Sequence, residues 1–89
     1  MTIKQRIAAK LTEALRPTAL EIVDESGRHA GHAGAGAGGE THFRLYIVSD
    51  RFAGKGRLER HRLVNALLAE ELAAGVHALA MTTLAPDEA

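Results

Sequence analysis

Histidine is the residue type in this sequence with the widest chemical potential. There are five histidines in 89 residues, and imidazole both binds metal ions and titrates near neutral pH. His29, His32 and His42 lie in residues 27–42, "GRHAGHAGAGAGGETH", which otherwise consist mostly of glycine and alanine. The three-residue spacing of His29 and His32 would allow chelation of a metal ion if this loop folded around it. Solvated imidazoles without any ligand are the plainer interpretation.

His77 comes at the start of the last predicted strand. If that strand is parallel to the strand predicted at 42–49, both strands begin at the same edge of the sheet. His77, His42 and either His29 or His32 would then converge at this edge. The alternative is that His77 is a half-buried strand residue without a ligand.

A second candidate site is the basic segment 51–62. Its cations are Arg51, Lys55, Arg57, Arg60 and Arg62. With the turn before it, this segment resembles the outline of a helix-turn-helix, although a solvated helix face has the same composition. Two observations argue against tight nucleic-acid binding: Lys plus Arg equals Asp plus Glu, 11 each, and only two Phe and one Tyr are available for base stacking.

Several other chemistries are excluded or disfavoured. With no cysteine, the chain alone offers no disulfide, thiol nucleophile or thiolate metal site. Ser26 and Ser49 lie in no nucleophile-elbow motif, and "AGKGR" at 53–57 lacks the phosphate-loop pattern. We therefore expect a non-enzymatic protein. No apolar run reaches the roughly 20 residues of a membrane helix, and the amphipathic pattern after Lys4 and Arg6 is not a signal peptide, so we expect a cytoplasmic location.

The first element that must position these residues is a helix at the N-terminus. Thr2 and Gln5 fit a capping box, and Pro17 ends the helix. Its apolar residues recur every four positions and form one stripe: Ile3, Ile7, Leu11 and Leu15.

Alternating apolar residues predict strands over about 19–24 and 42–49 and a last strand over 76–84. Between the last two strands, a helix is predicted over about 58–74, ended by Gly75. Glu70 and Glu71 near its C-terminus oppose the helix dipole, which makes a partner surface an option there.

These elements predict a small α/β (α+β) domain. The first two strands can pair antiparallel, and a right-handed crossover through the helix makes the second and third parallel. The helices would then cover one face of a mixed sheet. We expect residues 1–84 to form a single domain and 85–89 a flexible tail. His61 shares a helix face with Val64 and Leu68, so we expect a buried, hydrogen-bonded imidazole.

Four stretches of the sequence resemble the BolA family: "LEIVDESGRHAGH", "THFRLYIVSDRFAGK", "RHRLVNALLAEEL" and "GVHALAMTT". The resemblance covers about residues 3–83. It implies an αββααβ fold similar to the class II KH domain, with a three-stranded mixed sheet and helices packed on one face.

The same resemblance implies a partner and a cofactor. BolA-like proteins pair with monothiol glutaredoxins and share a [2Fe-2S] cluster, to which the glutaredoxin contributes a cysteine thiolate and glutathione. His77 matches the strand-start ligand of the family. His29 matches the loop ligand, with His32 as its rival, and no cluster is expected on the isolated chain. Because family members are also described as regulators of morphology and stress genes, DNA binding through Lys55, Arg57, Arg60 and Arg62 is the alternative.

Overall fold

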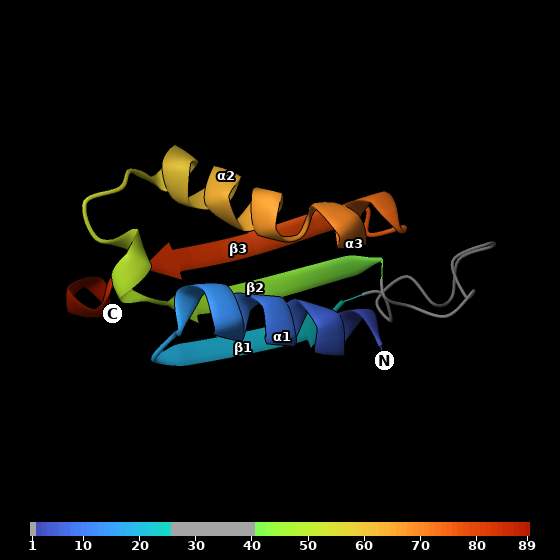
Figure 1. Cartoon of the computed structure of the whole chain (residues 1–89), viewed down its shortest axis with the longest axis horizontal. Coiled ribbons are helices and arrows are strands. Elements are labelled where there is room, and N and C mark those ends of the chain that lie inside the picture. Colours follow the sequence, from blue (N-terminus) through green and yellow to red (C-terminus); the bar gives the residue numbers. More distant parts are fainter. Residues whose placement is uncertain (1, 26–40) are drawn as a thin grey trace.

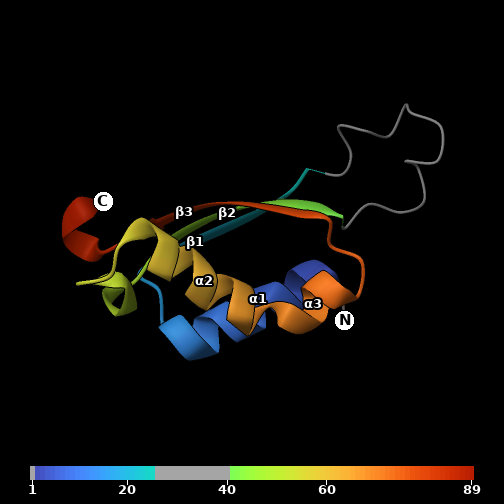
Figure 2. The ribbon, with the colours of Figure 1, turned by 90° about the horizontal axis from the view of Figure 1, so that it is seen from above.

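Three strands form a mixed sheet with the α-helices packed on one face, and none of the described helices covers the other face (Figures 1 and 2). The computed structural model describes residues 2–25 and 41–89. His29 and His32 therefore lie outside the described residues. The elements follow the order α1, β1, β2, α2, α3, β3, which confirms the predicted αββααβ architecture.

The sheet has β2 at its centre, as the crossover argument predicts. Strand β1 (Ala19–Asp24) pairs antiparallel with β2 (His42–Val48), and β2 pairs parallel with β3 (Ala78–Leu84). His42 is in register with Ala78. The connection from β1 to β2 and the start of β3 therefore lie at the same end of the sheet.

Helix α1 (Ile3–Leu15) has the predicted boundaries because both ends carry caps. The Thr2 hydroxyl accepts a hydrogen bond from the Gln5 backbone N–H at 3.1 Å, and Gln5 Oε1 accepts one from the Thr2 N–H at 2.9 Å. Arg16 ends the helix in the left-handed region, at φ 44°. The predicted apolar stripe packs on the sheet through the buried side chains of Ile7, Leu11 and Leu15.

The helix predicted over 58–74 is two helices, so the prediction of one continuous helix is wrong. Helix α2 (Arg57–Leu67) ends at Leu68, whose φ of −104° and ψ of 18° break the helix, and α3 (Ala69–Ala73) follows. The Leu68 side chain is fully buried. The break keeps Leu68 in the core while α3 turns toward α1, and no proline or glycine marks it in the sequence.

Glu70 and Glu71, which were expected near the C-terminus of one long helix, form ion pairs between α3 and α1. Glu71 is 1% exposed, and its Oε1 accepts a hydrogen bond from Lys10 Nζ at 2.9 Å, while Glu70 Oε1 accepts from the same ammonium at 2.8 Å. Arg6 Nη2 lies 2.9 Å from Glu71 Oε2, but without hydrogen-bond geometry. Both acids occupy the first turn of α3, where the helix dipole favours them, and both contact Lys10 of α1.

The core lies between the sheet and the helices. Phe43, Leu45 and Ile47 of β2 point into it, as their alternation predicts, while Arg44 is exposed on the open face. The other buried members are Ile7, Leu11, Leu15, Phe52, Val64, Leu68 and Val76. Within the part of the chain that the structure describes, no helix has the length and apolarity to cross a membrane.

The segment 85–89, predicted as a flexible tail, carries the 3-10 turn η3 (Pro86–Glu88). Ala85 at its start is only 2% exposed. At its end, the Glu88 carboxylate binds Arg60 of α2. A second 3-10 turn, η2 (Asp50–Phe52), follows β2 and is capped by the Ser49 hydroxyl.

Candidate metal-binding edge and basic segment

Two histidines meet at one edge of the sheet. His77 lies directly before β3, and its backbone N–H donates to the Thr41 carbonyl at 2.7 Å. His42 begins β2, and the centroids of the two imidazole rings are 6.1 Å apart. The predicted convergence of His77 and His42 is therefore confirmed. The His77 side chain is exposed, not half-buried as the alternative interpretation requires.

The neighbouring chain segments are tied together at this edge. His42 Nδ1 lies 2.9 Å from the Thr41 hydroxyl, which orients the ring. The His42 carbonyl accepts a hydrogen bond from the Glu25 N–H at 2.7 Å, and the Glu25 carboxylate accepts one from Arg44 Nε at 2.9 Å. Thr41 therefore contacts both histidines: its hydroxyl lies near the His42 ring and its carbonyl accepts from the His77 N–H.

The described part of this edge supplies two imidazole donors. Among residues 2–25 and 41–89, no group of three or more His, Cys, Asp or Glu side chains is arranged to hold a metal ion. A [2Fe-2S] cluster takes four ligands, usually thiolates. The donor set of His77 and His42 therefore fits a shared metal group only if further ligands come from residues 26–40 or from another molecule.

The environment of His61 differs from the predicted one. Val64 and Leu68 of its helix face are buried in the core. His61 itself is half-buried and lines a groove between α2 and β3, beside Met81. The prediction of a buried, hydrogen-bonded imidazole is wrong: three residues fall short of a full helical turn, so His61 is offset by about 60° from Val64 and lies in the groove rather than in the core.

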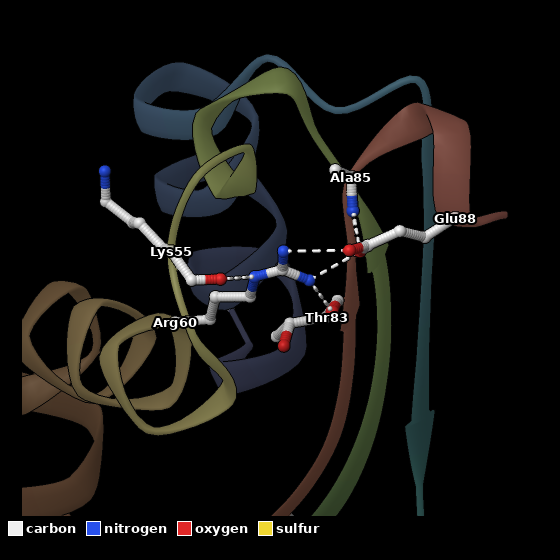
Figure 3. Close-up of polar contacts among 5 residues, drawn as sticks. All are labelled: Lys55, Arg60, Thr83, Ala85 and Glu88. Carbon is white, nitrogen blue, oxygen red and sulfur yellow. Dashed lines mark hydrogen bonds and ion pairs between the residues drawn. The ribbon is translucent and has the colours of Figure 1, made fainter.

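One arginine of the basic segment, Arg60, is buried and forms hydrogen bonds with other groups of the protein. Arg60 is 8% exposed, and its guanidinium donates to four oxygens (Figure 3). Arg60 Nε donates to the Lys55 carbonyl at 2.8 Å, and Nη1 donates to the Thr83 carbonyl at 2.9 Å. Nη1 and Nη2 also donate to the two carboxylate oxygens of Glu88, at 2.6 and 3.1 Å.

The carboxylate of Glu88 is bound from two sides. Besides Arg60, the Ala85 backbone N–H donates to Glu88 Oε1 at 2.7 Å. The Arg60 hydrogen bonds and, second, that of Ala85 lower the pKa of Glu88 from 4.5 to about 2. The same contact raises the pKa of Arg60. Both groups are therefore charged at physiological pH.

This pairing changes the set of residues available for nucleic-acid binding. Arg60, one of the four predicted contacts, has its guanidinium engaged by the protein itself. Arg57 and Arg62 have exposed side chains, and Lys55 is half-buried. Sequence reasoning missed the role of Arg60 because Glu88 lies 28 residues away, and no local pattern joins the two.

Comparison with known proteins identifies the family. The model of the family described as BolA-like protein matches residues 11–88. The chain is 51% identical over 83 residues to the DNA-binding transcriptional regulator BolA of Escherichia coli (strain K12), covering 93% of this chain and 75% of that protein. It is 51% identical over 84 residues to BolA-like protein 1 of Mus musculus, covering 94% of this chain but only 58% of that protein.

A solved structure agrees with the sequence relatives. The BolA domain of SufE1 from Arabidopsis thaliana superposes with a TM-score of 0.89 at 46% identity, covering 100% of this chain and 98% of that one. The two sequence relatives are named as a regulator and as a BolA-like protein, not as enzymes. On the evidence of the family match, the fold and the shared sequence, this chain belongs to the BolA family.

Proposed function

We propose that this chain is a non-enzymatic partner of a monothiol glutaredoxin and shares a [2Fe-2S] cluster with it, in iron–sulfur cluster trafficking or iron-responsive regulation. The ligands from this chain would be His77 and either His29 or His32. The observation that carries the proposal is the exposed imidazole of His77 directly before β3, with its ring centroid 6.1 Å from that of His42.

The position of His77 suits a ligand that must meet a second protein. Its backbone is fixed by the hydrogen bond to Thr41, so little ordering is needed when the exposed side chain binds. Neutral imidazole is a common metal ligand. The bound cluster would supply electron-transfer or cluster-donation chemistry, and histidine ligation raises its reduction potential relative to thiolate ligation.

The remaining ligands of the cluster would be thiolates from outside this chain. Because it contains no cysteine, thiolates would come from the glutaredoxin and its glutathione. His29 and His32 lie between Glu25 and Thr41 in the sequence, and the Thr41 carbonyl accepts a hydrogen bond from the His77 N–H.

The test is reconstitution with the partner. We expect a coloured heterodimer when this chain, a monothiol glutaredoxin and glutathione are combined under anaerobic, iron-replete conditions. Its visible circular dichroism should differ from that of the cluster-bearing glutaredoxin alone. An unchanged glutaredoxin spectrum and separate elution of the two proteins would contradict the proposal.

DNA binding is the second candidate function. It is favoured by the exposed side chains of Arg57 and Arg62 on α2, and the Escherichia coli relative is named as a DNA-binding regulator. The neutral net charge of this chain predicts that such binding is weak and strongly dependent on salt.

A further inference from the structure

A groove of about 370 Å³ runs between α2 and β3. Its strand residues belong to the second half of β3, whereas His77 lies directly before the start of that strand. Arg57, Arg60 and His61 line it from the helix, and Met81 and Thr83 line it from the strand. Glu88 closes one end. Strand β3 is an edge strand, with β2 as its neighbour on one side only.

The guanidinium of Arg60 is held in this groove without the help of Glu88. The Lys55 and Thr83 carbonyls accept from its Nε and Nη1, and its carbon Cζ lies 5.9 Å from the centroid of the Phe52 ring. Three fixed contacts therefore orient the guanidinium, with two N–H groups directed at the Glu88 carboxylate (Figure 3). An anion that replaced Glu88 would find these donors already in place.

Glu88 demonstrates which chemistry fits this position. Its carboxylate receives hydrogen bonds from both terminal nitrogens of Arg60 and from the Ala85 N–H. The Glu88 side chain is 41% exposed, whereas that of Arg60 is 10% exposed. A carboxylate from another molecule can therefore approach from solvent and compete with Glu88 for the same donors.

We propose that this groove is a docking site for an extended acidic segment of a partner protein, and that Glu88 occupies its carboxylate position in cis until the partner displaces it.

Charge complementarity argues for an acidic ligand. When Glu88 leaves, Arg57, Arg60 and His61 remain along one wall, and no other acidic residue lines the groove. Glu88 stays ionised across the physiological range, since its pKa is about 2. A competing anion, rather than a change of pH, must therefore release it.

The strand wall argues for a peptide rather than a nucleic acid. An edge strand can bind an extended chain through the backbone groups that its sheet leaves unpaired, the mode known as strand addition. In the groove the Thr83 carbonyl is already used by Arg60, so the added chain would pair with other backbone groups of β3. Met81 adds an apolar contact, and the groove is lined by no Phe, Tyr or Trp, so only His61 and the arginines could stack on a base. The groove and His77 lie at opposite ends of β3, so this proposal does not depend on the cluster.

The experiment compares the full chain with Glu88→Gln and with a variant lacking residues 86–89. The probe is a blocked hexapeptide of alternating glutamate and valine, titrated while the Ala85 amide and the Arg60 Nε–H signals are followed by NMR. Because hydrogen bonds between charged groups are among the stronger ones, we expect both variants to bind about tenfold more tightly than the full chain. Asp87→Asn is the matched control and should bind like the full chain.

A double variant and a neutral peptide test the proposal further. Adding Arg57→Gln to Glu88→Gln should weaken peptide binding, and the peptide with glutamine in place of glutamate should not bind. If the truncated variant does not fold, the comparison of peptide affinity between Glu88→Gln and the full chain is sufficient. Equal affinity of the full chain and Glu88→Gln, absence of binding by both, or tighter binding of a six-residue oligothymidylate than of the peptide would overturn the proposal.

Discussion

Arg60 joins three parts of the molecule that are distant in the sequence. It contacts the turn at Lys55, the edge strand at Thr83 and the C-terminal turn at Glu88. Removing either charge would leave hydrogen-bonding groups of the other partner unsatisfied, which costs more than the intact pair contributes. The C-terminal turn is therefore part of the folded unit through a single side chain.

Glu88 should make the stability of the protein sensitive to acid. Its pKa is lowered from 4.5 to about 2 in the folded state, so its contribution is fully present above about pH 4.5. That contribution is lost as the pH falls through the folded pKa, because protonation then removes the charge that Arg60 binds. We expect the full chain to melt above Glu88→Gln at pH 7, and this difference in Tm to vanish near pH 2.

The control for this prediction is Asp87→Asn, which removes a neighbouring carboxylate for which no hydrogen bond to Arg60 is recorded. Its Tm profile against pH should keep the acid-sensitive component seen in the full chain. A Tm difference between the full chain and Glu88→Gln that stays constant from pH 7 to pH 2 would show that the ion pair does not cause it.

His77 is the residue on which the cluster proposal rests. A ligand fixed by its backbone should matter more than one of two interchangeable histidines. We therefore expect His77→Ala to abolish or strongly destabilise the shared cluster with glutaredoxin, measured as visible circular dichroism and cluster lifetime. His29→Ala should change the spectrum and lifetime, with partial substitution by His32. A normal spectrum and lifetime with His77→Ala would contradict the assignment.

The other histidines provide controls for this measurement. His32→Ala alone should have little effect, and the double variant of His29 and His32 should resemble His77→Ala. His61→Ala should leave the cluster spectrum unchanged, because His61 lies in the groove between α2 and β3. Its half-buried position also predicts a smaller loss of thermal stability than a core histidine would cause.

Among the elements, α3 is linked to α1 by ion pairs of Glu70 and Glu71 with Lys10 and of Glu71 with Arg6. Glu71→Gln keeps the size of the buried side chain but removes the charge that faces Lys10 and Arg6. We expect it to lower the free energy of unfolding by about 1–3 kcal/mol, measured by urea denaturation. Glu70→Gln is the matched control: Glu70 contacts the same Lys10 ammonium but is 77% exposed, so the unfolding midpoint should hardly change.

The turn before α2 offers a matched pair of glycines. A Cβ added at either Gly54 or Gly56 would meet no atom within 4 Å, but Gly54 has φ +77° and Gly56 has φ −73°. Gly54→Ser should cost about 1–2 kcal/mol from left-handed strain. Gly56 is the N-cap of α2 and makes no side-chain cap, so Gly56→Ser should gain a few tenths of a kcal/mol. Urea denaturation of both variants checks this contrast, and equal effects would contradict it.

The elements themselves were largely predictable from the sequence. Alternation in "ALEIVD" and "HFRLYIV" predicts the strands because one face of the sheet is buried. The capping box and Pro17 predict both ends of α1. The break at Leu68 could not be predicted, since helix propensity continues through it and tertiary contacts of Leu68 and Glu71 decide the geometry.

At the scale of the whole molecule, one candidate site could be predicted from the sequence and the other could not. The topological rule for a crossover predicts that His77 and His42 share an edge, because it depends only on the order of elements. The pairing of Arg60 could not be predicted in this way, because it depends on a contact with Glu88, which lies 28 residues away in the sequence. Equal totals of acidic and basic residues likewise do not show which cations remain available to a ligand after folding.

The cations left exposed by folding define the test of DNA binding. Because Arg60 is engaged by Glu88, replacing it would confuse stability with binding, so Arg57→Gln with Arg62→Gln is the informative double variant. If these side chains contact phosphates, the slope of log affinity against log salt should fall by up to about 2. Lys4→Gln with Arg16→Gln, which removes the same charge from around α1, is the matched control and should retain the slope. This is measured by fluorescence anisotropy with a labelled duplex.

For the unmodified protein we expect weak, non-specific binding, with Kd on the order of 10⁻⁴–10⁻⁶ M at physiological salt. The physical reason is that a neutral molecule with two exposed arginines on α2 can release few counterions from DNA and has no general field to attract it. Equal loss of binding in the α1 control would show that total charge, rather than the α2 surface, governs the interaction. Tight, sequence-selective binding by the free chain would instead make DNA recognition the primary function and the shared cluster secondary.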